Sequence, residues 1–400
     1  MSLALSGVRV IALEQYGAGP WGTMQLADLG AEVIKIEDPS TGGDIGRYVP
    51  PYQSGSDSLF FESFNRNKKS IALDLKKPQG REIAHKLAAK CDVFVQNFRK
   101  GVAARLGLDY KTLRQLNERL IYASSSGYGP EGPDSGEPSF DYLGQARSGI
   151  MNVVGAHGSP PSYIFGGIAD QMGAIMLAYG IMTALLARER YGVGQEVDAS
   201  HLGSMIALQG LNVSFKTIVG MEFGRYPREQ AYNPLWNHYK CADGQWIAFA
   251  MLQADRYWKG FCTVLGLSEL ADDPRFADIR ARGQNAAALV EILDRTFAAR
   301  PRAEWLAILR DGGDFIYTIV NSISDLPHDP QVLTNRYIVD YEHPAFGATQ
   351  LVGLPVILSQ TPGDPCGYAP ELGQHSESIL TEMLGYSWDD IAELRREGVL

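Results

Sequence analysis

The stretch Val8-Arg9-Val10-Ile11-Ala12-Leu13 is apolar and ends in the polar residues Glu14-Gln15-Tyr16 and a glycine-rich turn at 17–22. A second largely apolar run, Glu32-Val33-Ile34-Lys35-Ile36-Glu37, follows a predicted helix at 21–29. Strand, helix and strand in this succession are typical of a parallel βαβ unit. This N-terminal pattern therefore predicts the start of a parallel sheet with helices packed on it.

The same alternation continues toward the middle of the chain. Further strands are predicted at 69–75, 92–96, 120–125 and 195–200, with helices at 78–90 and 113–119. Pro78 stands in the first turn of its helix, where a missing N–H costs nothing. The pattern predicts an α/β fold with a doubly wound parallel sheet.

A different pattern begins near residues 220–233, which are rich in aromatic residues and arginine. A hairpin is predicted at 239–250 around the turn Ala242-Asp243-Gly244, followed by helices at 255–265, 286–299 and 303–310. We expect a smaller α+β domain over 225–325. The end of the chain, from about 334 to 400, contains strand candidates and a last helix.

Composition narrows the class of protein. The 400 residues are 45% hydrophobic and 20% charged, with a net charge of −10, which argues against nucleic-acid binding. Four cysteines stand far apart without a CxxC pair or a His/Cys cluster, so neither a disulfide framework nor a metal site is expected. No signal peptide is recognisable, and the apolar run 172–187 is short for a membrane span. We expect a cytoplasmic protein that binds no membrane.

One carboxylate stands out in Phe165-Gly166-Gly167-Ile168-Ala169-Asp170-Gln171-Met172-Gly173, where small residues surround Asp170. The uncharged run that follows predicts a buried helix, so Asp170 is expected near a helix N-terminus, where the dipole favours a negative charge. Small neighbours leave room for a substrate. The pattern alone favours a simple helix cap over a nucleophile by roughly three to one.

A glycine motif and several basic positions indicate a ligand crevice. Gly17-Ala18-Gly19-Pro20-Trp21-Gly22 matches GxGxxG, but the intervening polar residues and bulky Trp21 make a dinucleotide site a weak alternative. Basic residues gather at predicted strand ends, where Arg and Lys suit phosphates and Phe98 suits an adenine face. A solvated basic surface is an equally good interpretation. These basic positions are Arg66, Lys68, Lys69, Lys76, Lys77, Arg99, Lys100 and Arg105.

Taken in order, several short motifs resemble the class III CoA-transferase family, which includes formyl-CoA transferase, carnitine CoA-transferase and α-methylacyl-CoA racemase. The resemblance runs almost end to end, and the order and spacing of the motifs carry it. The motifs are Ala18-Gly19-Pro20, Leu26-Ala27-Asp28-Leu29-Gly30-Ala31, Val33-Ile34-Lys35-Ile36-Glu37, Asn65-Arg66-Asn67-Lys68-Lys69-Ser70, Asn97-Phe98-Arg99, Asp141 with Gln145, Ala169-Asp170, Gly194-Gln195-Glu196-Val197-Asp198, Asp273-Pro274-Arg275-Phe276, Asp329-Pro330-Gln331 and Ala369-Pro370-Glu371-Leu372-Gly373-Gln374-His375.

The resemblance implies a function and a set of site residues. Asp170 matches the family's catalytic aspartate, and the implied substrates are an acyl-CoA and a small carboxylic acid, with no tightly bound cofactor and no metal. Asp141 and Gln145 belong to the family pattern and are expected in the CoA site, Asp141 to hold the pantetheine and Gln145 to orient a carboxylate, although a helix cap and a structural amide are their local alternatives. The positions that hold CoA in similar proteins are Tyr16, Gly17, Ala18, Leu73, Lys76, Asn97, Phe98, Arg99 and Arg105.

The resemblance also implies an architecture. Both chain ends would form a Rossmann-like large domain, residues 1–220 with a C-terminal return at 330–400, and the small domain would be 225–325. Two chains would thread through each other as an interlocked homodimer. Three departures are noted: Asp38 replaces a frequent arginine, 250–255 lacks the glycine-rich loop of the formyl-CoA branch, and Phe140 replaces the histidine of racemases.

The implied mechanism moves CoA through an aspartyl mixed anhydride and an aspartyl-CoA thioester, with backbone N–H groups of the Gly17-Ala18 turn or of the helix start as candidate oxyanion donors. The alternatives are an acyl-CoA racemase, which Phe140 disfavours, and a non-catalytic subunit that binds CoA. His201 is interpreted as a core residue without a functional companion. A cluster in the small domain hints at an aromatic or dicarboxylic acid, although packing is the commoner role: Arg225, Tyr226, Arg228, Tyr232, Trp236 and His238.

Overall fold

The computed structural model describes residues 2–50, 58–344, 346–365 and 367–400. The chain divides into two compact units. The first unit contains Met1–Val154, Pro161–Phe223 and Pro330–Leu400, and the second contains Gly155–Pro160 and Gly224–Asp329. Cys366 lies outside the described residues, and Cys91, Cys241 and Cys262 are free and buried.

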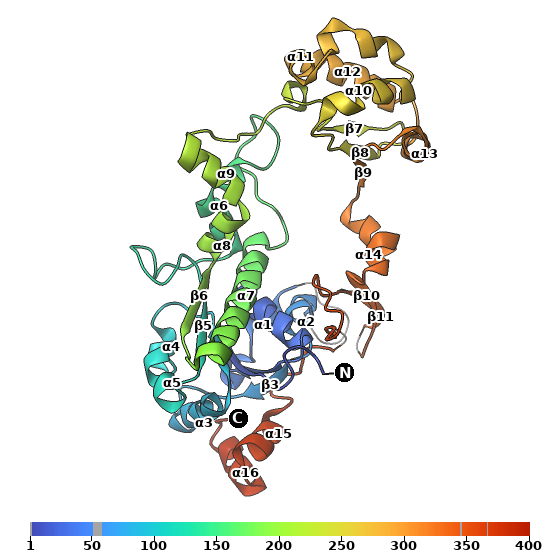
Figure 1. The fold of residues 1–400 in the computed structure, drawn as a ribbon. Helices are drawn as coiled ribbons and strands as arrows, with labels where there is room; N and C mark the ends of the chain where they lie inside the picture. The colour runs from blue at the N-terminus through green and yellow to red at the C-terminus, as the bar shows by residue number, and fades with distance from the viewer. Residues whose placement is uncertain (1, 51–57, 345, 366) are drawn as a thin grey trace. The chain divides into compact units, whose positions relative to one another are not determined.

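A six-stranded parallel sheet forms the centre of the first unit, and Figure 1 labels its strands β3, β5 and β6. The strand order is β3-β2-β1-β4-β5-β6. Ile11 of β1 pairs with Ile34 of β2 on one side and with Phe94 of β4 on the other. The strand order therefore reverses between β1 and β4, and this reversal opens a crevice at the carboxyl ends of the strands. The strands are β1 Arg9–Leu13, β2 Glu32–Glu37, β3 Lys69–Ala72, β4 Val93–Gln96, β5 Ile121–Ser126 and β6 Glu196–Ser200.

Alternating side chains of each strand build two cores. In β1, Val10 and Ala12 contact the helices α1 (Ala18–Asp28) and α7 (Ile168–Tyr191) on one face. Ile11 and Leu13 pack on the other face, against a core that includes side chains of α3, α5 and the C-terminal helices. Burial on both faces explains the nearly continuous apolar runs of these strands. The helices of this second face are α3 Pro78–Lys90, α5 Tyr110–Leu116, α16 Trp388–Arg396 and the helical turn Ile379–Met383, which directly follows α15 Ser376–Ser378.

The predicted strands and helices of the sheet agree with the structure to within three residues at most ends. The glycine-rich turn expected at 17–22 is a correction, because helix α1 already begins at Ala18. Pro20 fits there since the first turn of a helix needs no N–H from it. Gly22 lets α1 approach α7 closely, because a Cβ at this position would lie 3.0 Å from the carbonyl oxygen of Ala174.

Helix α7 is the long apolar helix that the sequence predicts. By length and composition it could cross a membrane, and 44% of its most apolar window is buried within the protein. Leu177, Ile181 and Leu185 pack into the core beside α1 and the sheet, which is the behaviour of a core helix. Its other face carries exposed apolar side chains.

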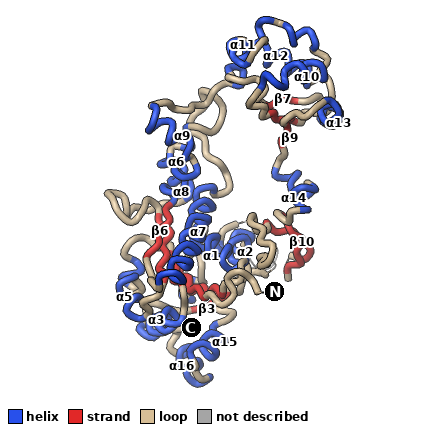
Figure 2. The backbone as a smooth tube through the Cα atoms, viewed as in Figure 1, coloured by secondary structure: helices blue, strands red, loops and turns tan. Residues whose placement is uncertain are grey.

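The second unit is a small α+β body with an antiparallel sheet in the order β7-β8-β9. Figure 2 distinguishes its strands from the surrounding helices by colour. Two arginines from the cluster at its start serve this unit: Arg228 forms an ion pair with Asp294, and Arg225 binds backbone oxygens at Ala156 and Ser159. The elements are β7 His238–Lys240, β8 Trp246–Phe249, β9 Tyr317–Val320, α10 Ala254–Val264, α11 Ile279–Gln284, α12 Ala286–Phe297 and α13 Arg302–Gly312.

The remaining elements belong to the first unit. Strands β10 and β11 form an antiparallel hairpin in the C-terminal segment. The bounds are α2 Leu59–Asn65, α4 Val102–Arg105, α6 Asp141–Ser148, α8 His201–Leu208, α9 Gly210–Ser214, α14 Pro330–Thr334, β10 Ile338–His343 and β11 Gly347–Val352.

Candidate active site

A cleft of about 480 Å³ opens where the strand order reverses, and residues of the first unit line it. The loops after β1, β4, β5 and β6 all reach it, as expected for the carboxyl edge of a doubly wound sheet. Asp170 is the carboxylate in the cleft that the sequence singles out. Further residues that line the cleft include Tyr16, Gly17, Ala18, Asn97, Phe98, Arg99, Lys100, Ser139, Phe140, Asp198 and His201.

Asp170 lies in the first turn of α7, but it does not cap the helix. The cap is supplied by Asp141, whose Oδ1 accepts hydrogen bonds from the backbone N–H of Ala169 at 2.6 Å and of Asp170 at 3.3 Å. Fully buried Gln145 donates to the other oxygen of Asp141 at 2.7 Å and exchanges two hydrogen bonds with the backbone of Ile164. Asp141 and Gln145 therefore fix the helix start from behind, which leaves the Asp170 carboxylate free for other contacts.

The two oxygens of Asp170 have different surroundings. Oδ1 lies 2.9 Å from Nε2 of His201, the first residue of α8. Oδ2 faces Gly17, at the start of α1, and so meets the positive end of that helix dipole. The first backbone N–H groups of α1 have no partner within the helix, which makes them available to an anion.

Gly17 is required by space rather than by backbone conformation. Its φ of −98° is open to any residue, but a Cβ there would lie within 2.8 Å of the Asp170 Cγ. We expect Gly17→Ala to displace the carboxylate and to lower kcat by about 10²-fold, the cost of a misplacement of about 1 Å. Steady-state kinetics of Gly17→Ala beside Gly210→Ala, where a Cβ meets nothing within 4 Å, checks this. A Gly17→Ala protein with normal kcat would show that the close contact is irrelevant to turnover.

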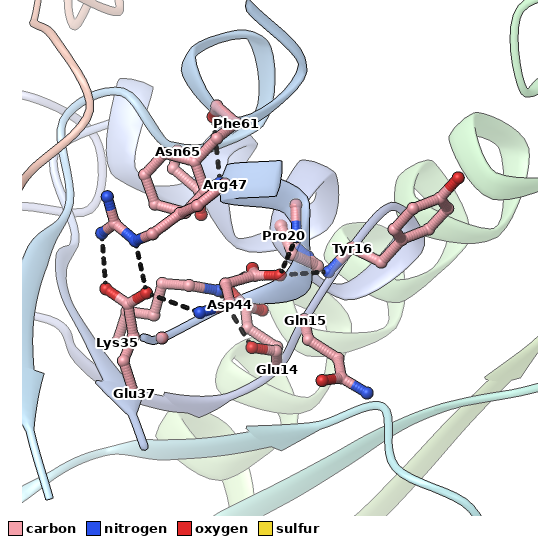
Figure 3. A network of polar contacts seen from close by, with 12 residues as sticks. Glu14, Gln15, Tyr16, Pro20, Lys35, Glu37, Asp44, Arg47, Phe61 and Asn65 are labelled. Atoms are coloured by element: carbon pink, nitrogen blue, oxygen red, sulfur yellow. Dashed lines mark hydrogen bonds and ion pairs between the residues drawn. The ribbon is translucent and has the colours of Figure 1, made fainter. Parts of the chain in front are cut away.

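Tyr16 precedes this contact in a left-handed conformation, with φ of +67°. Its backbone N–H donates to Oδ1 of Asp44 at 2.9 Å, as Figure 3 shows. Its neighbour Gln15 exchanges two backbone hydrogen bonds with the Asn97 side chain. Burial and the charges of Asp170 and Asp141 raise the pKa of the Tyr16 phenol, which therefore stays protonated at neutral pH. The strained residue is thus held from both sides.

A buried ionic cluster lies behind Tyr16. It consists of Glu14, Lys35, Asp44 and Lys68, whose side chains are fully or almost fully buried. Lys35 Nζ lies 2.7 Å from Asp44 Oδ2, and Lys68 Nζ lies 2.8 Å from Glu14 Oε1. Burial lowers the pKa of Lys68 to about 8, although Glu14 opposes the shift. For Lys35, burial acts to lower the pKa but the carboxylates, Asp44 foremost, outweigh it and raise it.

Two of the basic residues considered for phosphate binding serve the interior instead. Lys68 belongs to this ionic cluster, and Arg66 binds the buried Asp28 carboxylate with two nitrogens at 2.6–3.1 Å. The sequence leaves phosphate binding and a solvated surface open for both residues, and the structure supports neither, because each side chain is buried and paired with a buried carboxylate.

The structure brings together most, but not all, of the residues predicted to hold CoA. Tyr16, Gly17, Ala18, Asn97, Phe98 and Arg99 line the cleft with Asp170. Leu73 is fully buried in the core, and Arg105 ends the short helix α4 outside the lining. Lys76 lies outside it too, exposed and 3.0 Å from Asp38 Oδ2. The Asp38 carboxylate that stands in place of an arginine therefore pairs with the neighbouring lysine.

Comparison with known proteins gives this cleft its context. The model of CoA-transferase family III matches residues 5–376, nearly the whole chain. The chain belongs to CoA-transferase family III. Among its relatives, succinyl-CoA:glutarate CoA-transferase of Mus musculus is 36% identical over 99% of this chain and 90% of that protein. Cinnamoyl-CoA:phenyllactate CoA-transferase of Clostridium sporogenes is 32% identical over 98% of this chain and 96% of that protein.

A solved structure shares the fold of this family III chain. The crystal structure of a CaiB/BaiF family protein from Brucella suis superposes with a TM-score of 0.85 and 29% identity, covering 96% of this chain and 100% of that one. The α/β fold and the membership in an enzyme family of CoA-transferases are thus established. Within the described ranges, no group of three or more His, Cys, Asp and Glu side chains could hold a metal ion.

His201 is the residue of this family III site that the sequence interpretation missed. The sequence predicts a core residue without a functional companion, whereas the structure places its ring against Asp170. The available signal was its place as the first residue after a predicted strand of the sheet, at the edge where ligands bind. The cleft also contains Lys100, one of the basic positions named above, which ties the loop after β5 through Pro130 and Ser135, and Asp198 of the motif 194–198, whose pKa is raised by burial.

Proposed function

We propose that this chain transfers CoA from an acyl-CoA thioester to a small carboxylic acid, with Asp170 as the covalent acyl carrier. The observation that carries the proposal is the Asp170 carboxylate in the cleft, with Oδ2 against the start of α1. A carboxylate that is ionised at pH 7 can attack the thioester to form a mixed anhydride. The backbone N–H groups of Gly17 and Ala18, at the start of α1, suit the oxyanion that develops on the substrate carbonyl.

We assign CoA binding to the cleft. Arg99 offers a guanidinium for a phosphate, Phe98 a ring for the adenine, and Asn97 and Tyr16 line the way to Asp170. Lys76 and Arg105 would act from outside the cleft, on the parts of CoA farthest from the thioester, whereas Leu73, buried in the core, supports the fold. CoA and its esters are substrates in this scheme, so no resident cofactor is required.

The names of the relatives cover both acid classes that the sequence suggested, a dicarboxylate and an aromatic acid. Arg225 and Arg228 are engaged in the second unit, so they add no support for either class. Racemisation is the weaker alternative, because Phe140 occupies the racemase histidine's place and the imidazole of His201 touches Asp170. Two groups in contact cannot act on opposite faces of one substrate carbon.

The direct test is to find the covalent intermediate. Wild-type protein is mixed with succinyl-CoA, glutaryl-CoA, acetyl-CoA or cinnamoyl-CoA, quenched with hydroxylamine and digested for peptide mass spectrometry. A hydroxamate at Asp170 is the expected result, and the ester that labels best identifies the donor class. Deuterium uptake at the acyl Cα without any label at Asp170 would replace the transferase proposal with the racemase.

We also propose that the chain works as an interlocked homodimer in the cytoplasm. Free, buried cysteines fit a reducing compartment. The dimer has support in one face of α7, on which Ile175, Tyr179, Met182 and Leu186 are exposed at helical spacing. An apolar stripe of this length on a core helix is typical of an interface.

We expect Leu186→Glu to prevent dimer formation, because a charge would be buried in an apolar contact. Light scattering coupled to size exclusion measures the mass directly. The matched control is Leu116→Glu, an exposed leucine on α5 at the opposite face of the sheet, which should leave the mass unchanged. A Leu186→Glu protein that remains a dimer would exclude this face of α7 from the interface.

A further inference from the structure

The imidazole of His201 is buried in the site, in a space that two neighbouring helices leave open. It is the first residue of α8 and almost fully buried, with 7% of its surface exposed. Two glycines make room for it: a Cβ on Gly144 would lie 2.9 Å from the His201 Cβ, and one on Gly173 would lie 3.2 Å from its Cδ2. Helices α6 and α7 therefore both leave space for the ring at the point where it meets Asp170.

The surroundings of the ring favour a proton on Nε2, because this nitrogen lies beside a carboxylate oxygen. Nδ1 lies 3.2 Å from the Ser139 hydroxyl, which can donate to it. Nε2 then carries the hydrogen and points into the region of Asp170 Oδ1. The approach to Oδ1 lies outside hydrogen-bond geometry, and Nε2 has no other partner among the described residues. The N–H is therefore committed to no other group, and such contacts often tighten only when substrate is bound.

We propose that His201 is the oxyanion donor for the carbonyl that Asp170 itself becomes during transfer. The inference rests on the proposed function and assigns separate tasks to the two oxygens. Oδ2, at the start of α1, is the nucleophile, while Oδ1, beside His201, remains the carbonyl oxygen of every covalent intermediate. The N–H groups of α1 serve the substrate carbonyl, and His201 serves the Asp170 carbonyl.

The first half of the reaction shows where this donor acts. Oδ2 attacks the donor's carbonyl carbon, the C–S bond breaks, and CoA leaves as the thiolate. The thiolate then attacks Cγ of Asp170, and the negative charge of the tetrahedral intermediate develops on Oδ1, at His201. Collapse of this intermediate breaks the Cγ–Oδ2 bond, releases the donor acid as a carboxylate and leaves an aspartyl-CoA thioester.

The second half reverses this order. A carboxylate oxygen of the acceptor attacks Cγ, again with the charge on Oδ1, and CoA leaves as the thiolate. The thiolate attacks the acceptor's carbonyl carbon, and the bridging oxygen stays with Asp170 as its new Oδ2. No net proton transfer is needed in any step. His201 therefore assists the two middle steps and leaves the first and last to the N–H groups of α1.

The test separates these steps in variants of His201. His201→Phe removes the donor. In His201→Gln the side-chain amide N–H can occupy the position of Nε2, whereas in His201→Asn the shorter amide can occupy only the position of Nδ1. We expect kcat to fall by about 10²–10³-fold in His201→Phe and His201→Asn, the usual cost of one oxyanion donor. His201→Gln should recover to within about tenfold of wild type, and KM for the acyl-CoA should change little in all three.

Acid-quenched intact mass spectrometry then identifies the intermediate. With succinyl-CoA and no acceptor, wild-type Asp170 should carry CoA as the thioester. His201→Phe should instead carry the acyl group and release free CoA, because formation of the anhydride is spared and its conversion is slowed. If another acyl-CoA labels wild-type Asp170 more fully than succinyl-CoA does, that ester is used in its place.

Three results would overturn the proposal. One is a His201→Phe protein in which both adducts form slowly but the ratio of CoA adduct to acyl adduct equals that of wild type. This result is expected of a residue that only supports packing. Another is recovery by His201→Asn but not by His201→Gln, which would place the effect at Ser139. A wild-type protein that carries neither adduct would overturn the Asp170 route itself, and the role of His201 with it.

Discussion

Replacing Asp170 by asparagine is expected to lower kcat for CoA transfer by about 10⁴-fold or more, the scale seen when a covalent nucleophile is lost. The amide has nearly the same shape as the carboxylate, so its contacts with Gly17 and His201 persist. What disappears is the ionised oxygen that attacks the thioester. Initial rates of acyl-CoA formation from donor and acceptor acid measure the loss.

Two measurements show whether the loss is chemical. Asp141 and Gln145 hold the start of α7 without help from Asp170, so the thermal midpoint of Asp170→Asn should stay near that of wild type. Its affinity for free CoA should likewise change by only a few fold. The matched carboxylate is Glu189, exposed near the other end of the same helix, and Glu189→Gln should retain full activity. Substantial turnover by Asp170→Asn would show that neither nucleophilic attack by the carboxylate nor its charge is needed for transfer.

The sequence was sufficient for the sheet because the signal there is local. In β1, for example, Val10 and Ile11 face different cores, so the run is apolar throughout and bounded by polar residues. The start of α1 was misplaced because glycines and proline have low helix propensity, whereas the structure tolerates them in a first turn that packs closely on Asp170 and α7. Tertiary contact overrode the local preference.

Only those site residues that lie in a recognisable motif or directly after a predicted strand could be predicted from the sequence. Asp170, Asn97 and Arg99 carry such signals, and the structure brings them into one cleft. The contact between Asp170 and His201 joins two helices through packing of α6, α7 and α8, and no periodicity encodes it. The burial of Lys35 was equally hidden, because a lysine in a strand pattern normally indicates a solvent-facing position.

Lys35→Met is expected to destabilise the first unit by about 3–5 kcal/mol, the cost of breaking a buried ion pair by removing one partner. Lys35 is fully buried, 2.7 Å from Asp44 Oδ2, and donates to the backbone oxygen of Glu14 at 2.9 Å. Two cations and two anions balance in this cluster. Methionine keeps most of the volume but leaves an excess negative charge without solvent.

The same change should reach the active site through Asp44. Oδ1 of Asp44 accepts from the N–H of Tyr16 at 2.9 Å and of Gly46 at 2.7 Å, so it holds the residue next to Gly17 in its left-handed conformation. Without Lys35, the buried Asp44 carboxylate is stabilised if it turns toward water or takes up a proton. Either change weakens the hydrogen bond that it accepts from the Tyr16 N–H. The free energy of unfolding measured in urea and kcat at 25 °C, both determined on the same protein, should therefore fall together.

Lys35→Met combined with Asp44→Asn separates charge from hydrogen bonding. The asparagine oxygen still accepts from Tyr16 and Gly46, and the cluster is again neutral, with Glu14 paired to Lys68 at 2.8 Å. If charge imbalance is the main cost, the double variant should recover about half or more of the lost stability and most of the lost kcat, whereas Asp44→Asn alone should be destabilising since it strands Lys35. A double variant no better than Lys35→Met would show that the lysine acts chiefly through its hydrogen bond to Glu14, and the link from the ionic cluster to Tyr16 would fail.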